Sequence, residues 1–298
     1  MKSDMIKNWL LLNVDICFVS ETHLKPEQKF EVPPFVTINN PYTGKSKKPR
    51  GGISCFIQEN CLPFVKSVDK SANDIICITL RGGHKVFSNY IPPVDSIFFK
   101  DEMFTSVANE FLPGDNERIV FGGGDMNCRI GNLTRKPGRC SEYRDNPDSE
   151  TNSHGRFLNE ICSSFNCFPL NNLTHKKKFF DGKFTYYKGN KKSQNDIILG
   201  NHKALDCIEK FTIHEISFNP SDHFPLVVNC NFSAGVEDHM PKAAADLLTD
   251  AAVKSYKPSK KIRSPDVNWE NYVVLAQSEI DCLIPTLLPS RHHQQRAD

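Results

Sequence analysis

Acidic side chains stand beside several predicted strands, where they could hold a metal ion or move a proton. Glu21 follows the apolar run 15–20, Asp125 follows the run 118–121 after three glycines, and Asp196 precedes the run 197–199. Because strand ends open into loops while a sheet fixes their positions, such side chains can be exposed and still held in place. Carboxylate oxygens suit Mg²⁺, which also binds substrate phosphate. These residues therefore indicate metal-assisted chemistry on a phosphate ester.

A histidine beside an acid adds a second kind of chemistry. Ser221, Asp222 and His223 precede the apolar run 224–228. An imidazole next to a carboxylate can transfer a proton or stabilise a pentacovalent phosphate. Each short segment alone is more typical of a turn or a loop cap, the Gly-Gly-Asp at 123–125 included, whereas a buried Asp196 would need a partner. The four segments in this order are the stronger signal.

Strands with interspersed helices must position these residues. Apolar runs bounded by Gly, Pro, Asn or Asp predict strands at 15–20, 53–57, 75–80, 85–90, 118–121, 184–187, 196–199, 211–216 and 224–228. Apolar spacing predicts helices at 5–14, 100–112, 154–165 and 202–209. This mixture is typical of a layered α/β protein.

Composition favours a folded protein with reduced cysteines. The 298 residues are 39% hydrophobic and 24% charged, which provides for a substantial core. An apolar run of membrane-spanning length and a secretory signal are both missing, so we expect no membrane partner and an intracellular location, nuclear or cytoplasmic, rather than secretion. The 11 cysteines form no CxxC pair, which favours structural thiols over a zinc site.

Basic residues cluster locally although the formal net charge is only +2. The runs lie at 45–50, 176–178, 188–192 and 257–263. Solvated loops are the simpler interpretation, and phosphate contacts are the alternative. The candidate nucleic-acid contacts are Lys47, Lys48, Arg50, Lys177, Lys191 and Lys192. Binding through them would weaken steeply with salt.

The amino-acid composition changes near residue 233, where an Ala- and Asp-rich stretch is followed by a basic segment with prolines. We predict a domain at 1–232, a linker at 233–265 and a short helical or disordered tail at 266–298. An amphipathic helix would fit 266–285.

Residues 15–232 taken together resemble the endonuclease/exonuclease/phosphatase superfamily. The resemblance is carried by Glu21-Thr22-His23, Tyr90-Ile91-Pro92, Gly124-Asp125-Met126-Asn127, Asp196 and Ser221-Asp222-His223. Within the superfamily, the segments 50–54, 152–158 and 184–186 look most like the endonuclease domain of a non-LTR (LINE-type) retrotransposon. The resemblance implies a four-layer α/β/β/α sandwich with the site at one end. It also implies nicking of DNA by hydrolysis of phosphodiester bonds with Mg²⁺, or Mn²⁺ in its place, and without a small-molecule cofactor.

The same resemblance implies which residues would contact metal and phosphate. Glu21 would bind the metal ion, and Asp222 would help hold the metal or a water. Tyr90 would hydrogen-bond the scissile phosphate.

The remaining motif residues would act on the water and the phosphate oxygens. Asp125 would orient or deprotonate the attacking water, and Asn127 would help position water and phosphate. His223 would contact a phosphate oxygen and would itself be oriented by Asp196.

The chain departs from the superfamily pattern in two places. Members begin with a central strand that carries an Asn of the site, whereas Met1 here falls within the first helix. We therefore expect backbone and apolar surface on the neighbouring strands to be exposed and activity to be impaired. Asn195 stands where relatives place an apolar residue, which is expected to weaken packing near Asp196. A reverse transcriptase is expected downstream in a full-length relative, but its motif is missing and polymerase activity is not predicted.

Two alternatives stay open at this point. A phosphatase of the same superfamily acting on inositol phosphates would suit the segment 124–129, but its Trp-Cys-Asp-Arg segment is replaced by Ser193-Gln194-Asn195-Asp196. A catalytically inactive retrotransposon remnant would retain the motifs without the activity. The target sequence or structure on DNA is not readable from these residues.

Overall fold

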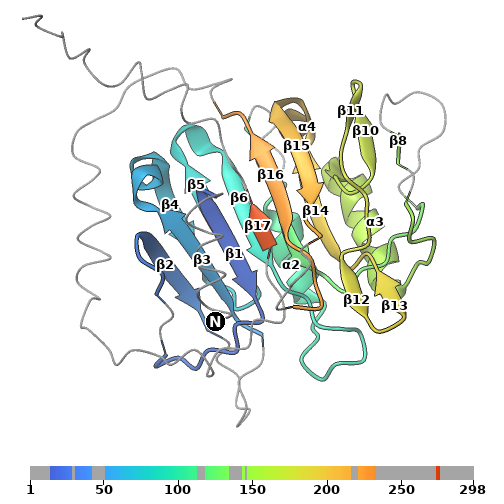
Figure 1. Ribbon diagram of the computed structural model, residues 1–298, viewed down its shortest axis with the longest axis horizontal. Coiled ribbons are helices and arrows are strands. Elements are labelled where there is room, and N and C mark those ends of the chain that lie inside the picture. Colours follow the sequence, from blue (N-terminus) through green and yellow to red (C-terminus); the bar gives the residue numbers. More distant parts are fainter. Residues whose placement is uncertain are drawn as a thin grey trace, which may run out of the picture.

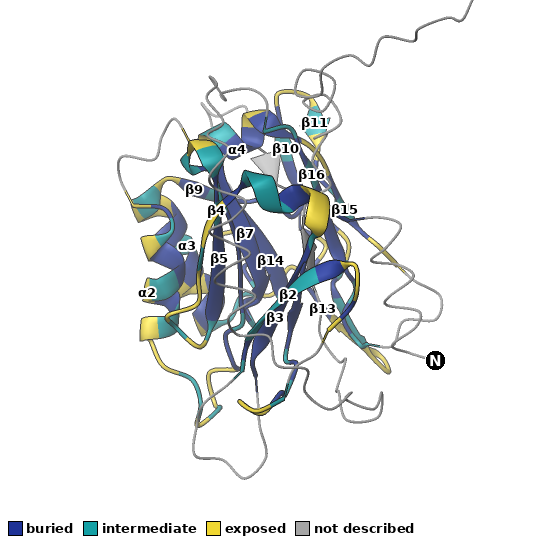
Figure 2. Ribbon diagram, turned by 90° about the vertical axis from the view of Figure 1, so that its left-hand side faces the viewer, coloured by how far each residue is buried: buried dark blue, intermediate teal, exposed yellow. Residues whose placement is uncertain are grey.

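Two layers of β-strands packed face to face form the centre of the protein (Figure 1). The computed structural model describes residues 14–28, 31–41, 51–112, 118–133, 143–144, 146–215, 221–232 and 273–275. Apart from Val14, the expected helix at 5–14 lies outside these residues, as do the basic runs at 45–50 and 257–263 and the linker at 233–265. Helices cover one face of the larger sheet, so the expected α/β sandwich is confirmed (Figure 2).

The larger sheet has six strands in the order β4-β5-β6-β7-β14-β9. Their bounds are β4 (Val65–Asp69), β5 (Ile75–Leu80), β6 (Lys85–Asn89), β7 (Val120–Asp125), β14 (Asp196–Asn201) and β9 (Cys167–Pro169). Strand β7 runs parallel to β6 and antiparallel to β14. Figure 2 shows α2 (Glu102–Asn109) and α3 (Ser153–Phe165) on one face of this sheet, and β2 and β3 on the other.

The second layer contains two smaller sheets. One has the order β17-β1-β3-β2, with β17 (Val273–Leu275), β1 (Ile16–Ser20), β3 (Ile53–Gln58) and β2 (Phe35–Asn40). The other pairs β15 (Ile208–Ile213) with β16 (Leu226–Cys230), and α4 (His202–Cys207) precedes it. Strand β1 is buried along its whole length and is paired on both edges, by β3 and by β17. The expected exposure of its backbone is therefore not found where β17 pairs with it.

Short elements project from the ends of the sandwich. The hairpin of β12 (Tyr186–Lys188) and β13 (Lys191–Ser193) lies at the end where β1 finishes, and the hairpin of β10 (Leu173–His175) and β11 (Lys178–Phe179) lies at the opposite end (Figure 1). Strand β8 (Tyr143–Arg144) pairs with β10. Two 3-10 turns, Glu59–Phe64 and Arg81–Gly83, connect strands.

Alternation along the strands builds two apolar cores. In β5, Ile76 and Ile78 pack between the two layers of strands, whereas Ile75 and Cys77 pack toward the helices. Because successive side chains of a strand point to opposite faces, a strand buried on both faces must be apolar throughout. This explains why the central strands read as continuous apolar runs in the sequence.

The structure corrects several sequence expectations. The three glycines before Asp125 are not a turn but the second half of β7. A Cβ at Gly123 would lie 1.9 Å from the carbonyl oxygen of Ile197, so the close approach of β14 excludes a side chain there. Strand β15 ends at Ile213, earlier than expected, and the tail residues 273–275 form a strand where a helix was expected.

The described helices and cysteines bear on two sequence expectations, the membrane and the state of the thiols. None of the helices in the described ranges is long and apolar enough to cross a membrane. The nine described cysteines are free and buried, as expected for structural thiols. Burial raises the pKa of these thiols at Cys17, Cys55 and Cys128, which keeps them protonated.

Candidate active site

Two acidic residues face each other across neighbouring strands. Asp125 is the last residue of β7 and Asp196 is the first of β14, and the antiparallel register pairs them directly. Residues opposite one another in such a pair have Cβ atoms only about 4.5–5.5 Å apart. Both are buried, with exposed fractions of 3% and 1%. Two carboxylates held so closely repel each other, unless one of them keeps its proton or a positive charge lies nearby.

His223 supplies part of that positive charge. Its Nδ1 lies 2.8 Å from Oδ2 of Asp196, and its Nε2 lies 4.0 Å from Oδ2 of Asp125. The imidazole packs against the edge of Tyr186, with ring centroids 4.9 Å apart. The backbone N–H of His223 donates to Oγ of Ser221 over 3.0 Å. The ring is thereby fixed between the two carboxylates.

The environment shifts the protonation of this group of residues. Burial raises the pKa of Asp125 to about 8, because the pull of His223 in the other direction is smaller. The negative charges of Asp196 and Glu21 add to the rise. Burial alone would lower the pKa of His223, but the carboxylates of Asp196 and Asp125 outweigh it and raise this pKa to about 10. The imidazole is therefore an imidazolium at neutral pH.

We expect stability to fall as pH rises from about 8 to about 10 because of His223. In this range the native imidazole keeps its proton, whereas the unfolded imidazole, with a pKa near 6.5, has lost it. The native state then binds more protons, so raising the pH favours unfolding. Urea titrations across this range measure the slope, and His223→Gln should flatten it. Equal slopes in both proteins would contradict an ionised pair.

The loop after Asp125 is tied to the segment that carries Tyr90. The N–H of Asn127 donates to Oδ1 of Asp125 over 3.0 Å, and Nδ2 of Asn127 donates to the carbonyl of Ile91 over 3.0 Å. The N–H of Ile91 donates in turn to the carbonyl of Asp125 over 2.9 Å. Asn127 therefore links the two motifs, and its Nδ2 lies 3.4 Å from Oδ2 of Asp125.

Glu21 and Tyr90 lie at the same end of the sandwich. Glu21 directly follows β1 and adopts a φ of 50°, a left-handed conformation that is uncommon outside glycine and concentrates at functional sites. The next two residues donate backbone hydrogen bonds to Gly52 and Gly51. A Cβ on Gly51 would lie 3.7 Å from the ring of Tyr90, so the ring borders this turn. Because the charge of Glu21 raises the pKa of Asp125, the two carboxylates are electrostatic neighbours.

Asp222 and the predicted DNA-contacting lysines do not all lie at the same end of the sandwich. Oδ2 of Asp222 lies 3.5 Å from Nζ of Lys188 on β12. Lys191 and Lys192 are exposed on β13, and Nζ of Lys192 lies 4.5 Å from the ring centre of Phe184. The turn that carries Lys177 is at the opposite end of the molecule from this hairpin (Figure 1). Lys47, Lys48 and Arg50 lie outside the described residues.

Backbone hydrogen bonds to one threonine hold the first residue of β14. Oγ1 of the fully buried Thr185 accepts the N–H groups of Asn195 and Asp196, each over 3.1 Å. Asn195 itself is only partly buried. The sequence marks Thr185 only as part of the segment 184–186. Its contact with Asp196 depends on strand pairing and has no local signal.

The donor set suits a divalent cation. The donor atoms of Asp125, Asp196 and His223 lie within 4.8 Å of one another, and all three residues are buried. Oxygen ligands of Asp and Glu are those that Mg²⁺ prefers. Asp196 is committed to Nδ1 of His223, which leaves Asp125 as the carboxylate of this group that is available to such an ion. Neither Glu21 nor Asp222 is a member of this group among the described residues.

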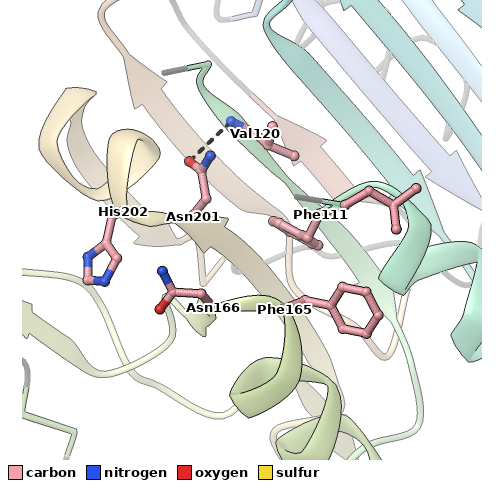
Figure 3. A pocket seen from close by; sticks show the side chains of 7 residues that line it. Phe111, Val120, Phe165, Asn166, Asn201 and His202 are labelled. Atoms are coloured by element: carbon pink, nitrogen blue, oxygen red, sulfur yellow. Dashed lines mark hydrogen bonds between the residues drawn. The ribbon is translucent and has the colours of Figure 1, made fainter. Parts of the chain in front are cut away.

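A pocket elsewhere on the sandwich is unrelated to these residues (Figure 3). It is lined by Phe111, Leu112, Val120, Phe165, Asn166, Asn201 and His202. Asn201 ends β14 and Val120 begins β7, whereas Asp196 and Asp125 stand at the other ends of these strands. The carboxylate cluster and this pocket are therefore separated by the length of the two strands.

No protein-family model and no curated protein matches the chain. The solved structures that match the chain include the following two. One is an Asp-to-Asn variant of the 3′ phosphatase NExo from Neisseria bound to a product DNA hairpin, with a TM-score of 0.48 and 12% identity, covering 75% of this chain and 91% of that one. The other is the endonuclease domain of TRAS1, a telomere-specific non-LTR retrotransposon, with a TM-score of 0.46 and 15% identity, covering 74% of this chain and 88% of that one.

Proposed function

We propose that this protein is a divalent-metal-dependent endonuclease that nicks DNA by hydrolysing a phosphodiester bond. The observation that carries the proposal is the buried group of Asp125, Asp196 and His223 at one end of the sandwich. A carboxylate with a raised pKa beside an imidazolium fits acid–base chemistry on a phosphate. These three residues are also members of the sequence motifs that resemble the superfamily.

Each side chain has a distinct task in this proposal. Asp125 orients the attacking water and accepts its proton, and Asn127 fixes the orientation of the Asp125 carboxylate. The imidazolium of His223 donates from Nε2 to a phosphate oxygen, because Nδ1 is held by Asp196. Tyr90 donates its hydroxyl to another phosphate oxygen.

A divalent ion bound by Glu21 and Asp125 would neutralise charge that develops on the phosphate. Burial raises the pKa of Asp125, and a cation at this place would stabilise its charged form. We assign Mg²⁺ to this place, with Mn²⁺ as a substitute. Asp222 is the candidate for an additional ligand or for a contact with bound water.

The choice of DNA over an inositol phosphate is supported by the β12–β13 hairpin. It places the exposed Lys191 and Lys192 at the end of the sandwich where β1 finishes, where they could contact the backbone of a long nucleic acid (Figure 1). A substrate panel tests this choice. With Mg²⁺, we expect the protein to relax supercoiled plasmid and to release no phosphate from inositol polyphosphates. Phosphate release without nicking would assign the site to the phosphatase alternative.

Replacing Lys191 and Lys192 with Ala should weaken DNA binding and flatten its salt dependence. Each lost phosphate contact reduces the magnitude of the negative slope of log K, the logarithm of the binding constant, against log salt by about 1. Fluorescence anisotropy with a labelled duplex at several salt concentrations measures both quantities. Lys177→Ala, on the turn at the opposite end, is the matched control and should leave the slope unchanged. If all variants share the slope of the unaltered protein, this hairpin is not part of the DNA-binding surface.

A further inference from the structure

We infer that Asp148 is a positioning residue that holds the two carboxylates of the proposed active site in register. Asp148 is 1% exposed and lies in the segment between β8 and α3. It is not one of the motif residues. The inference rests on the proposed function, and it adds to that function a residue that contacts neither substrate nor metal.

One carboxylate joins two segments that are far apart in the chain. Oδ2 of Asp148 accepts Nε of Arg129 over 2.9 Å and the backbone N–H of Gln194 over 2.9 Å. Oδ1 accepts a second guanidinium nitrogen of Arg129 over 2.6 Å and the N–H of Glu150 over 3.2 Å. Planar pairing of both carboxylate oxygens with one guanidinium fixes the relative orientation of the two groups.

The two segments that Asp148 joins are those that carry the site. Arg129 follows Asp125 by four residues, and Gln194 precedes Asp196 by two. The backbone of Arg129 is itself fixed, because its N–H donates to Oδ1 of Asn152 over 3.0 Å and its carbonyl accepts the N–H of Asn152. A shift of the Asp148 carboxylate would therefore be transmitted to both loops, one on each side of the Asp125–Asp196 pair.

The guanidinium of Arg129 is held by carboxylates in this arrangement. Its guanidinium is bound to Asp148 and also reaches Glu150, and its side chain is 25% exposed. Glu150 is 71% exposed on the outer side of the same guanidinium, where its contribution is screened by water. The two acids around Arg129 thus form a natural pair for comparison, one buried and tied to Gln194, the other on the surface.

Kinetics of Asp148→Asn, Glu150→Gln and Asn201→Ala test the inference. Asn201→Ala removes the cap of α4 at the far end of β14 and serves as the control for general loss of stability. At a temperature where all proteins are folded, we expect Asp148→Asn to lower kcat for nicking roughly 10- to 100-fold, as loss of a supporting contact does elsewhere, with KM little changed. Glu150→Gln and Asn201→Ala should keep the unaltered kcat. A kcat for Asp148→Asn equal to that of Asn201→Ala would overturn the positioning role.

A second measurement keeps the inference testable if the protein does not cut DNA. In that case the proposed function fails, and the ¹⁵N signals of the His223 ring report the geometry by themselves. We expect them to move in Asp148→Asn, because Asp196 is displaced from Nδ1, and to stay in place in Glu150→Gln and Asn201→Ala. Unmoved His223 signals in Asp148→Asn would refute the inference independently of activity.

Discussion

Replacing Asp125 with Asn is expected to lower the rate of Mg²⁺-dependent nicking roughly 10²- to 10⁴-fold. Asn keeps the size of the side chain and an oxygen that can accept the N–H of Asn127, but it can neither take up a proton nor carry charge. Because burial raises the pKa of Asp125, its charged form is costly to the fold. We therefore expect this variant to be at least as stable as the unaltered protein. Nicking rates and thermal unfolding of both proteins measure the two effects.

Loss of activity without loss of stability is what distinguishes a catalytic carboxylate from a structural one. Glu209→Gln, at an exposed position on β15, is the matched control and should change neither property. A nicking rate for Asp125→Asn within a few-fold of the unaltered rate would remove Asp125 from the mechanism.

Asp196→Asn and His223→Ala are expected to reduce nicking by similarly large factors, roughly 10²- to 10⁴-fold each. Without Asp196, His223 loses the main contributions that raise the pKa of its imidazole, so this pKa falls and the ring loses the partner that orients it. Because the two residues act as one unit, the double variant should be no slower than the slower single variant. Single-turnover cleavage of a labelled duplex measures the three rates.

The double variant carries the decisive information in this series. If the two losses multiply, Asp196 and His223 act independently, and the 2.8 Å contact between them does not orient the imidazole for catalysis. Lys210→Ala, at an exposed position on β15, is the control variant and should leave the cleavage rate unchanged.

Local patterns in the sequence predict the central strands and most residues of the site. The strands predicted at 15–20, 75–80 and 196–199 are found at 16–20, 75–80 and 196–201, because both faces of each are buried, which requires mostly apolar residues. Asp125 and Asp196 are recognisable from their positions beside such runs. That they face each other follows from the register of β7 and β14, which is a nonlocal property.

Features that depend on contacts between distant residues cannot be predicted from local sequence patterns. The glycines before Asp125 read as a turn, although they allow close approach of β7 to its neighbours. Lys177 belongs to a basic run like that of Lys191, yet the fold carries the two to opposite ends (Figure 1). Asp148 lacks any local signal, because its partners Arg129 and Gln194 lie 19 and 46 residues away.

Nicking of supercoiled plasmid by the purified protein, with Mg²⁺ or with EDTA, tests the central claim most directly. The account predicts conversion of supercoiled to open-circular DNA in Mg²⁺, none in EDTA, and none with Asp125→Asn in either condition. Intact supercoiled DNA after incubation of the folded protein with Mg²⁺, or equal nicking by Asp125→Asn, would contradict the assignment of this site to DNA hydrolysis.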